Sequence, residues 1–247
     1  AVVDLVTDTD RAAERLILDR LGEAFPGHAI LSEEAGAIIP ADGHRAPICW
    51  VIDPLDGTTN FAHGVPHFAV SIAAVLAPGS GSAALPDPRT ARAVAGVVYD
   101  PMRDETFVAY DDAPATLDDR PIAVSAAAKL DSSLLATGFP YDRRDHLDSY
   151  LEYWRTLMVR ARDIRRMGAA ALDLAWVACG RVDGFWEWRL KPWDVAAGAL
   201  LVRQAGGCVT DFHGAEPGLD ATQTLATNGR IHEELLHAMA PLPGPTG

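Results

Sequence analysis

The hydrophobic and polar positions of this chain change period many times, so strands and helices are predicted to be mixed along its whole length. Helical spacing predicts helices over 10–25, 146–159, 168–180, 195–206 and 231–239, the third of them apolar nearly all round and therefore buried. Shorter apolar or alternating runs predict strands over 28–31, 48–52, 68–76, 93–100, 105–110, 133–139, 162–167, 182–190 and 208–212. Because the order is not a strict alternation of strand and helix, we expect α+β layers and not a doubly wound sheet.

The stretches between these elements bound the domain organisation. Segments 35–47 and 77–92 contain glycine, proline and aspartate, which predicts a surface loop and a long exposed hairpin connection. No repeat and no clean linker interrupts the 247 residues, so we predict a single domain over 1–247, with a flexible tail at 241–247. The chain starts at Ala1 and enters strand- or turn-like sequence almost at once, so an upstream segment is expected to be missing.

The strongest candidate for a functional motif follows the apolar run 48–52, where the sequence is Asp-Pro-Leu-Asp-Gly-Thr-Thr-Asn-Phe over 53–61. Two aspartates three positions apart, with a proline between them, can converge on one point. Oxygen ligands of this kind suit a hard cation such as Mg²⁺. The Gly-Thr-Thr turn offers backbone N–H groups to an anion, above all if it opens a helix. The run therefore indicates metal-assisted phosphoryl chemistry, although either aspartate taken alone could be a capped turn.

Other carboxylates carry weaker signals. Glu33 and Glu34 follow a short strand, so one side chain could face a metal while the other faces solvent. Asp194 precedes an apolar helix and Asp10 lies in Thr-Asp-Thr-Asp, and both have the sequence setting of a helix N-cap. Glu187 lies between two tryptophans and is either a ligand for substrate hydroxyls or a solvated edge residue.

Composition excludes several classes of function. The chain has 34 acidic and 21 basic residues and a net charge of −13, which argues against a general surface for nucleic acid or anionic membrane. An anionic substrate then has to be attracted locally, most simply by bound cations. The three cysteines (Cys49, Cys179 and Cys208) lie in apolar stretches without metal spacing, so we expect buried free thiols in a cytoplasmic protein. Scattered histidines and the absence of zinc, P-loop or nucleophile motifs leave little support for covalent or zinc chemistry.

Assembled in order, these pieces resemble the inositol monophosphatase family. The match spans essentially the whole chain, and Asp-Pro-Leu-Asp-Gly-Thr together with Trp-Asp-Val-Ala-Ala-Gly is highly specific. The matching segments are 4–10, 32–34, 53–61, 64–66, 168–171, 193–198 and 205–207. The resemblance implies a layered αβαβα sandwich, dependence on two or three Mg²⁺ ions, inhibition by Li⁺, and a homodimer.

The resemblance also implies roles for single residues. Side-chain metal ligands would be Glu33, Asp53, Asp56 and Asp194, joined by the backbone carbonyl of Leu55. Gly57 and Thr58 would hold the phosphate through N–H groups, and Glu33, Thr58 and Asp10 would be catalytic, the last two by orienting the attacking water. The hydroxyl side of the substrate would meet Gly168, Ala169, Ala170, Glu187 and Asp56. Since many relatives carry Ser or Thr where this chain has Ala169, one hydrogen bond to substrate is expected to be absent.

The function implied is hydrolysis of myo-inositol monophosphate by in-line attack of a metal-activated water, without a phospho-enzyme. Histidinol phosphate, fructose 1,6-bisphosphate and other sugar or nucleotide phosphates are alternatives, because fold and metal site do not separate them. A regulatory or binding protein that has kept the fold and lost catalysis is the alternative from a different class.

Overall fold

Six α-helices and two β-sheets form the part of the chain that the computed structural model describes, which is residues 6–40, 47–76, 85, 87, 91–220 and 222–242. The helices are α1 (Asp8–Ala24), α2 (Thr58–Ala62), α3 (Leu147–Met158), α4 (Ala170–Ala178), α5 (Pro192–Gln204) and α6 (His232–Met239), with a short 3₁₀ turn at Leu130–Ser132. Among these residues, no helix combines the length and the apolar character needed to cross a membrane.

The larger sheet has the strand order β2-β1-β3-β4-β5-β6-β7-β8. Its strands are β1 (Ala29–Ser32), β2 (Gly36–Ile38), β3 (Ile48–Asp56), β4 (Ala69–Leu76), β5 (Arg92–Asp100), β6 (Glu105–Tyr110), β7 (Ala113–Leu117) and β8 (Arg120–Pro121). Strands β1 and β3 pair in parallel, and the other neighbours are antiparallel.

The smaller sheet has the order β10-β9-β11-β13-β12. Its strands are β9 (Leu134–Thr137), β10 (Asp163–Arg165), β11 (Gly184–Trp188), β12 (Cys208–Thr210) and β13 (Gln223–Thr227). Here β9 is parallel to both β10 and β11, whereas β13 is antiparallel to β11 and β12. Both sheets are therefore mixed, as the irregular order of elements along the sequence predicts.

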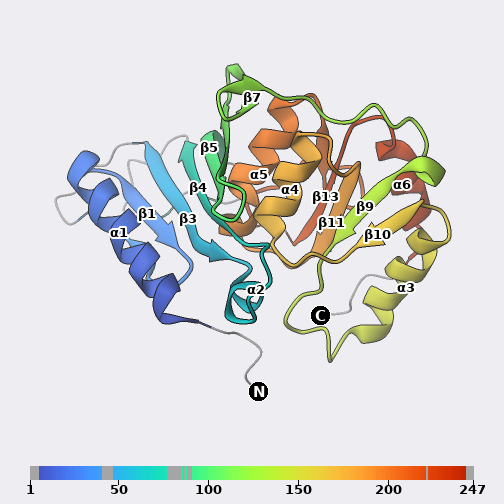
Figure 1. The fold of residues 1–247 in the computed structure, drawn as a ribbon, viewed down its shortest axis with the longest axis horizontal. Coiled ribbons are helices and arrows are strands. Elements are labelled where there is room, and N and C mark those ends of the chain that lie inside the picture. The colour runs from blue at the N-terminus through green and yellow to red at the C-terminus, as the bar shows by residue number, and fades with distance from the viewer. Residues whose placement is uncertain are drawn as a thin grey trace.

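The elements stack in five layers (Figure 1). Helix α1 covers the outer side of the larger sheet, α4 and α5 lie between the two sheets, and α3 and α6 cover the outer side of the smaller sheet. The predicted layered α+β fold is confirmed. Helix α2 lies at the end of β3, below β3 and β4 in this view.

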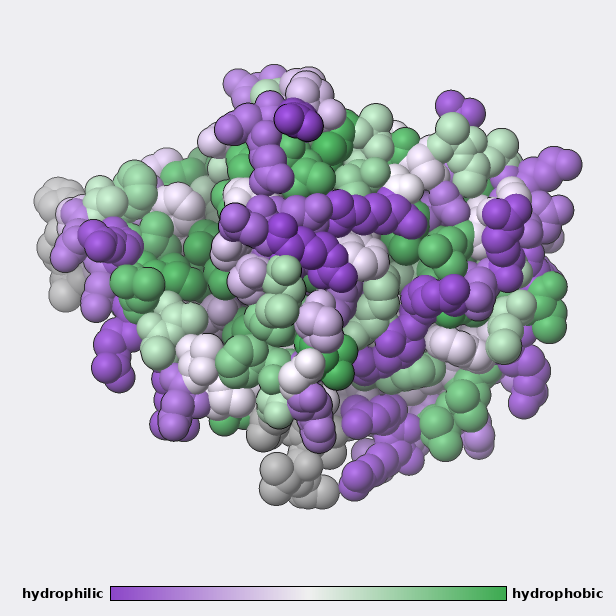
Figure 2. Space-filling view, viewed as in Figure 1, coloured by the Kyte–Doolittle hydropathy of each residue, from purple (hydrophilic) through white to green (hydrophobic). Residues whose placement is uncertain are grey.

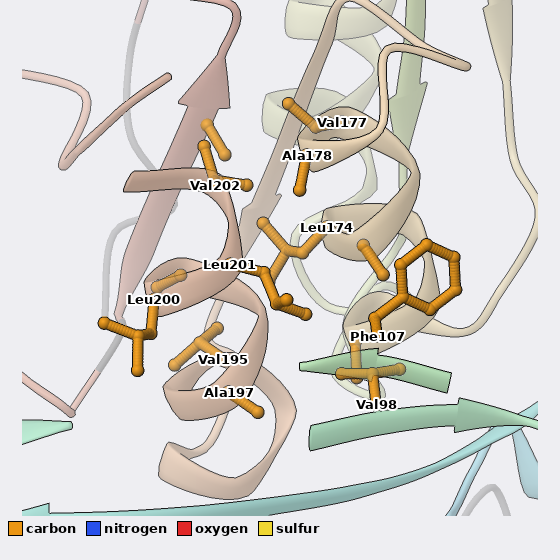
Figure 3. Packing of buried hydrophobic residues seen from close by; sticks show 14 of the residues in the cluster. Val98, Phe107, Leu174, Val177, Ala178, Val195, Ala197, Leu200, Leu201 and Val202 are labelled. Carbon is orange, nitrogen blue, oxygen red and sulfur yellow. The ribbon is translucent and has the colours of Figure 1, made fainter. Parts of the chain in front are cut away.

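Helices α4 and α5 are the centre of the main hydrophobic core. Their sequences are apolar on nearly every side because both sheets face them, and the core joins Val98 and Phe107 of the larger sheet to Leu174 of α4 and Leu201 of α5 (Figure 3). These side chains have less than 1% of their surface exposed. Truncating a fully buried leucine such as Leu174 to alanine typically costs about 2–5 kcal/mol of stability.

A second core lies on the outer face of the smaller sheet, beneath α3 and α6. Three aromatic rings are its centre: Trp188 of β11 lies 5.3 Å from Tyr153 of α3 and 4.6 Å from Phe212, measured between ring centroids. Such tilted and edge-on pairs add to the stabilisation from burial. The surface seen in the same view carries hydrophobic residues beside α1 and β1 (Figure 2), and Leu16 and Phe25 are exposed.

Several boundaries and one helix face differ from the predictions. Strand β2 lies inside the predicted loop 35–47, and β7, β8 and β13 were not predicted. Helix α1 begins at Asp8 behind the N-cap Thr7, so Asp10 is not the cap. Its buried positions are Asp10 and Glu14, whereas Ala24 and Phe25, which have the helical spacing of an apolar face together with Ile17 and Leu21, are exposed. Of the three free cysteines only Cys49 is buried, and Cys179 and Cys208 are half-buried.

Some predictions concern residues outside the described part of the chain. These are most of the connection 77–92, part of the loop 35–47, the first two residues of the 4–10 motif, and most of the tail 241–247.

Candidate active site

A bulge in β3 sets the direction of the two central aspartates. Asp53 pairs with Ser71 of β4 and Asp56 with Ala69, so three steps along β3 match two along β4. In a regular strand, side chains three positions apart face opposite sides of the sheet. The extra residue of the bulge removes that alternation. Proline has no N–H to donate to the neighbouring strand, and Pro54 is tolerated in the bulge because the regular pairing is interrupted there. Asp53 and Asp56 consequently line the same cavity.

The cavity has a volume of about 210 Å³ and lies at the end of β3. All predicted site residues line it except two: Asp10 lies behind Thr58, and Ala169 is buried beside Gly57. The predicted residues in the lining are Glu33, Asp53, Leu55, Asp56, Gly57, Thr58, Gly168, Ala170, Glu187 and Asp194. Segments far apart in the sequence therefore meet here.

Backbone N–H groups hold the carboxylates of two of the predicted metal ligands. Asp53 Oδ1 accepts from Leu55 N–H at 2.9 Å, and Asp194 Oδ2 accepts from Lys191 N–H at 2.7 Å. Lys191 is thus the N-cap of α5 and Asp194 stands in its first turn, so the interpretation of Asp194 as the cap residue is wrong. Glu33 is placed by its own N–H, which donates to the Ile52 carbonyl of β3 at 3.2 Å.

Asp56 is bound to the beginning of α4. Its Oδ1 accepts from Ala170 N–H at 3.1 Å, and its Oδ2 accepts from Ala171 N–H at 2.8 Å and Leu172 N–H at 3.4 Å. These are N–H groups that a helix cannot pair internally. The carboxylate also lies at the positive end of the helix dipole. Asp56 therefore fixes α4 to the end of β3.

The carboxylates raise one another's pKa. Burial first, then the charges of Glu33, Asp56 and Asp194, raise the pKa of Asp53 well above its usual value. Burial and the nearby Asp173 raise the pKa of Asp56 to about 6, although N–H donors of α4 act against this. Burial likewise raises the pKa of Asp194, with added repulsion from Asp56 and Glu33. Repulsion between these carboxylates would be reduced by a bound cation.

The donor set fits Mg²⁺, because it consists of oxygen atoms only and its charge needs a cation to offset it. As the side chains stand, no three histidine, cysteine, aspartate or glutamate residues of the described part are close enough to surround one ion.

Gly57 joins the bulge to α2 and adopts a left-handed conformation with φ of 89°. A Cβ at this position would lie 3.1 Å from both the Ala169 Cβ and the His67 carbonyl oxygen. Glycine is therefore required by backbone angle and by space. The first turn of α2, which starts at Thr58, leaves N–H groups without helical partners, as the predicted phosphate contacts need.

Asp10 and Thr58 are brought together by the start of α1. Thr58 Oγ1 lies 3.0 Å from Asp10 Oδ1 and 3.0 Å from the Leu55 carbonyl. Asp10 Oδ2 accepts from Thr7 N–H at 2.8 Å and from the Thr7 hydroxyl, which completes a capping box. The Thr58 hydroxyl is thus fixed by two oxygen atoms from different elements.

Glu14 supports the site and was missed in the sequence. It is buried in α1, and its Oε1 accepts from the Ser32 hydroxyl and from Ala35 N–H at 2.9 Å, which fixes the turn that carries Glu33. The available signal is its spacing, since it follows Asp10 by four residues and so lies on the same helix face.

Glu187 faces the cavity from β11, while Trp186 and Trp188 point into the core on the other side of the sheet. A Cβ on Gly138 would lie 2.1 Å from Glu187 Oε2, so the carboxylate occupies space that only glycine leaves free. Burial raises the pKa of Glu187 well above its usual value, and the charge of Arg166 acts in the opposite direction. Sequence reasoning missed Gly138 and Arg166, which carry no local motif.

Comparison with known proteins decides the family. A model of the inositol monophosphatase family matches residues 1–242. The chain belongs to the inositol monophosphatase family. The Asp-Pro-Leu-Asp-Gly-Thr and Trp-Asp-Val-Ala-Ala-Gly segments, which carried the resemblance in the sequence, both line the cavity of this family member.

Relatives within the inositol monophosphatase family have two kinds of name. The protein named Nus factor SuhB of Pseudomonas aeruginosa is 47% identical over 240 residues, covering 96% of this chain and 83% of that protein. The inositol-1-monophosphatase of Synechocystis sp. is also 47% identical over 240 residues, covering 97% and 78%. The structure of inositol monophosphatase from Anabaena (Nostoc) sp. PCC 7120 matches with a TM-score of 0.85 at 43% identity, covering 97% of this chain and 88% of that one.

Proposed function

We propose that this chain is a Mg²⁺-dependent phosphomonoesterase whose substrate is myo-inositol monophosphate. The observation that carries the proposal is the convergence of Glu33, Asp53, Asp56 and Asp194 on one cavity beside Gly57 and Thr58. Membership of a metal-dependent phosphatase family supports it, as does a relative named inositol-1-monophosphatase. Glu187, which faces the same cavity, supports a substrate with hydroxyl groups.

The proposed mechanism assigns each group a task. Glu33, Asp53, Asp56, Asp194 and the Leu55 carbonyl would hold the metal, which supplies positive charge for the phosphate and lowers the pKa of the attacking water. Thr58 Oγ1, fixed between Asp10 Oδ1 and the Leu55 carbonyl, orients that water. N–H groups of Gly57 and Thr58 hold the phosphate in line for attack.

The substrate side of the pocket is assigned in the same way. Glu187 and Asp56 accept hydrogen bonds from the hydroxyl groups, and Gly168 and Ala170 leave room for the ring. Ala169 is buried away from the cavity lining and offers no side-chain hydrogen bond. The homodimer and the cytoplasmic location remain predictions.

Asp53→Asn and Asp194→Asn test the metal assignment. Each change removes a ligand charge with almost no change of shape, so we expect kcat/KM to fall by at least about 100-fold, on the scale of a lost electrostatic catalytic group. The measurement is phosphate release from inositol 1-phosphate with and without Mg²⁺, with circular dichroism to check folding. Asp119→Asn is the matched control, because Asp119 is exposed in a turn with φ of 62°, which asparagine also tolerates. Activity near that of the wild type in either site variant would rule out the metal assignment.

A substrate panel separates the alternatives. Histidinol phosphate, fructose 1,6-bisphosphate and adenosine 3′,5′-bisphosphate are assayed beside inositol 1-phosphate. Preference for another ester would keep the mechanism and change the substrate.

The second candidate function is a regulatory or binding role, which a relative named Nus factor at 47% identity favours. Complete absence of Mg²⁺-dependent release from the whole panel would support that role.

A further inference from the structure

Asn60 belongs to the 53–61 motif, and none of the tasks in the proposed mechanism falls to it. It stands in α2, directly after the turn of Gly57 and Thr58 that is proposed to hold the phosphate, which we call the phosphate turn. None of the five residues of α2 is buried, so the hydrophobic core does not hold this helix in place. A helix this short is not stable by itself. The position of the phosphate turn therefore depends on contacts made by side chains of α2.

The side-chain amide of Asn60 joins α2 to two segments that are distant from each other in the sequence. Its Nδ2 donates to the His67 carbonyl at 2.7 Å and to the Met167 carbonyl at 2.8 Å. Both partners can only accept hydrogen bonds, so the nitrogen of the amide and not its oxygen has to face them. Each of the two N–H groups serves one carbonyl. The amide thus connects α2 with the segment that leads into β4 and with the segment that leads into α4.

The same two segments enclose the phosphate turn. A Cβ on Gly57 would lie 3.1 Å from the His67 carbonyl oxygen and 3.3 Å from the Gly168 carbonyl oxygen. A Cβ on Gly168 would in turn lie 3.3 Å from Asn60 Nδ2. The amide therefore lies at the place where the phosphate turn, the start of β4 and the start of α4 meet, and its bonds set the distances between them.

The phosphate turn and the start of α4 are assigned to different halves of the proposed substrate. The N–H groups of Gly57 and Thr58 hold the phosphate, whereas Gly168 and Ala170 line the part of the cavity given to the polyol ring. The ester bond that is hydrolysed joins these two halves. Attack in line with that bond requires a fixed position of one half relative to the other, and a displacement of about 1 Å can lower the rate on the order of 100-fold.

We propose that Asn60 is a positioning residue for phosphoryl transfer, whose two N–H bonds hold the phosphate turn against the start of α4 so that phosphate and polyol are aligned for attack. Asn60 is not among the residues that line the cavity, so it acts through the backbone of its neighbours. This inference rests on the proposed phosphomonoesterase function. Without the amide each half of the site keeps its own binding groups, so its loss acts on turnover more than on binding.

Three variants of Asn60 test this role by steady-state kinetics with Mg²⁺ on the preferred ester of the panel. In Asn60→Ala and Asn60→Asp, kcat should fall at least about 10-fold while KM stays within about 3-fold, because alignment matters in the transition state. The first variant removes both donors, and the second places acceptor oxygens against two carbonyls. Asn60→Gln keeps both amide donors on a longer side chain and should retain more of kcat than the other two. Circular dichroism and Tm identify the folded variants.

Asn228→Ala is the matched control, because Asn228 makes the same kind of double contact elsewhere. Its Nδ2 donates to Ser125 Oγ at 2.9 Å and to the Ala127 carbonyl at 2.8 Å. Its own N–H donates to the Asp183 carbonyl, just before β11 begins, whereas Glu187 lies near the other end of that strand. Loss of this asparagine should lower Tm and leave kcat unchanged.

The outcomes separate the inference from the proposed function. A loss of kcat at nearly constant KM in Asn60→Ala and Asn60→Asp, smaller in Asn60→Gln and absent in Asn228→Ala, supports the inference. An unchanged kcat in folded Asn60→Ala or Asn60→Asp, a loss explained by KM alone, or an equal loss of kcat in Asn228→Ala overturns it while the phosphatase function stands. Absence of Mg²⁺-dependent release by the wild type from the whole panel overturns the proposed function, and the inference with it.

Discussion

Single residues in the cavity depend on partners that are distant in the sequence. The Glu187 carboxylate occupies the space where a Gly138 side chain would begin, and the Glu14 carboxylate receives the Ser32 hydroxyl. Gly138 leaves room for the Glu187 carboxylate, and Ser32 donates a hydrogen bond to the Glu14 carboxylate. The position of each carboxylate is therefore decided by a second segment of the chain.

Gly138→Ala should damage substrate binding. Its Cβ would lie 2.1 Å from Glu187 Oε2, so the carboxylate must move out of the place where it faces the substrate. We expect KM for the preferred ester to rise about 10-fold, the effect of roughly 1.4 kcal/mol of lost binding. Steady-state kinetics measures this.

Gly22→Ala makes the same chemical change without a clash, because nothing lies within 4 Å of a Cβ at Gly22. In the interior of α1 this change should instead raise stability by about 0.5–1 kcal/mol. An unaltered KM in Gly138→Ala would show that the position of the Glu187 carboxylate does not matter for substrate binding.

This dependence explains which site residues could be predicted from the sequence. Asp53 and Asp56 belong to one short motif, so their meaning can be found locally. Glu14 and Gly138 carry meaning only through contacts with other segments, and pattern alone does not identify those contacts. Asp10 and Asp194 look like caps, whereas each stands in the first turn of its helix and accepts from the cap residue's N–H.

Among the secondary-structure elements, α6 contacts the smaller sheet through hydrogen bonds of one neutral histidine as well as through the apolar core beneath it. His232 Nε2 lies 2.9 Å from Thr210 Oγ1 of β12, and Nδ1 lies 2.9 Å from Thr227 Oγ1 of β13. The Thr210 hydroxyl donates to the Asp211 carbonyl, so its oxygen accepts from Nε2–H and Nδ1 is left to accept from Thr227. A proton on Nδ1 would remove that last bond.

We predict that His232 makes stability fall in mild acid. Burial lowers the pKa of His232 below its usual value of 6.5, so the unfolded chain binds the proton more readily than the folded one. The stabilisation is complete above pH 6.5 and is lost as pH falls from there through the lower pKa of the folded state. Thermal unfolding of the wild type and of His232→Asn at pH 7.5 and 5.5 measures this drop, because the buried acids of the cavity contribute alike in both proteins.

In His232→Asn the drop in Tm should be smaller by roughly 2–4 °C, the effect of about 1 kcal/mol in a chain of this size. His237→Asn is the control, since His237 is exposed on the same helix. Equal drops in both variants would exclude His232 as the source.

Helices and strands with a clear hydrophobic periodicity of their own could be predicted from the sequence. Strands that form mainly because they pair with neighbouring strands could not. The central helices α4 and α5 are long and apolar, and β4 to β6 have strand-like runs that the structure confirms. Strand β13 has the mixed sequence Gln-Thr-Leu-Ala-Thr and becomes a strand because it pairs on both sides, with β11 and β12. Strand β2 has three residues and, within the described part of the chain, pairs with β1 alone.

At the scale of the whole molecule, negative charge from different layers collects in one cavity. Asp53 and Asp56 come from the larger sheet, Glu187 from the smaller sheet and Asp194 from α5. Raised pKa values mean that these acids favour the protonated form in the folded state. Their contribution to stability is therefore present at low pH and is lost as pH rises through the folded pKa, which is about 6 for Asp56.

Mg²⁺ should reverse this loss. We predict that the rise in Tm between EDTA and 5 mM Mg²⁺ grows from pH 5.5 to pH 8, because ligands bind only when ionised and stabilise the state to which they bind. Taking the difference at each pH cancels the opposite effect of His232. Asp194→Asn should reduce the rise, whereas Asp119→Asn should not. A rise that is the same at every pH would contradict ligation by acids of raised pKa.

The order of the layers along the chain has a consequence for how the protein is made. The larger sheet is complete at Pro121, but α4 and α5, which cover its inner face, follow only at Ala170 and Pro192. During synthesis, Phe107 and Val98 therefore leave the ribosome well before the helices that bury them. A nascent chain of this length presents an uncovered apolar sheet, the kind of surface that chaperones bind and that aggregates when they are scarce. Translation speed between Pro121 and Pro192 consequently sets how long that face stays uncovered.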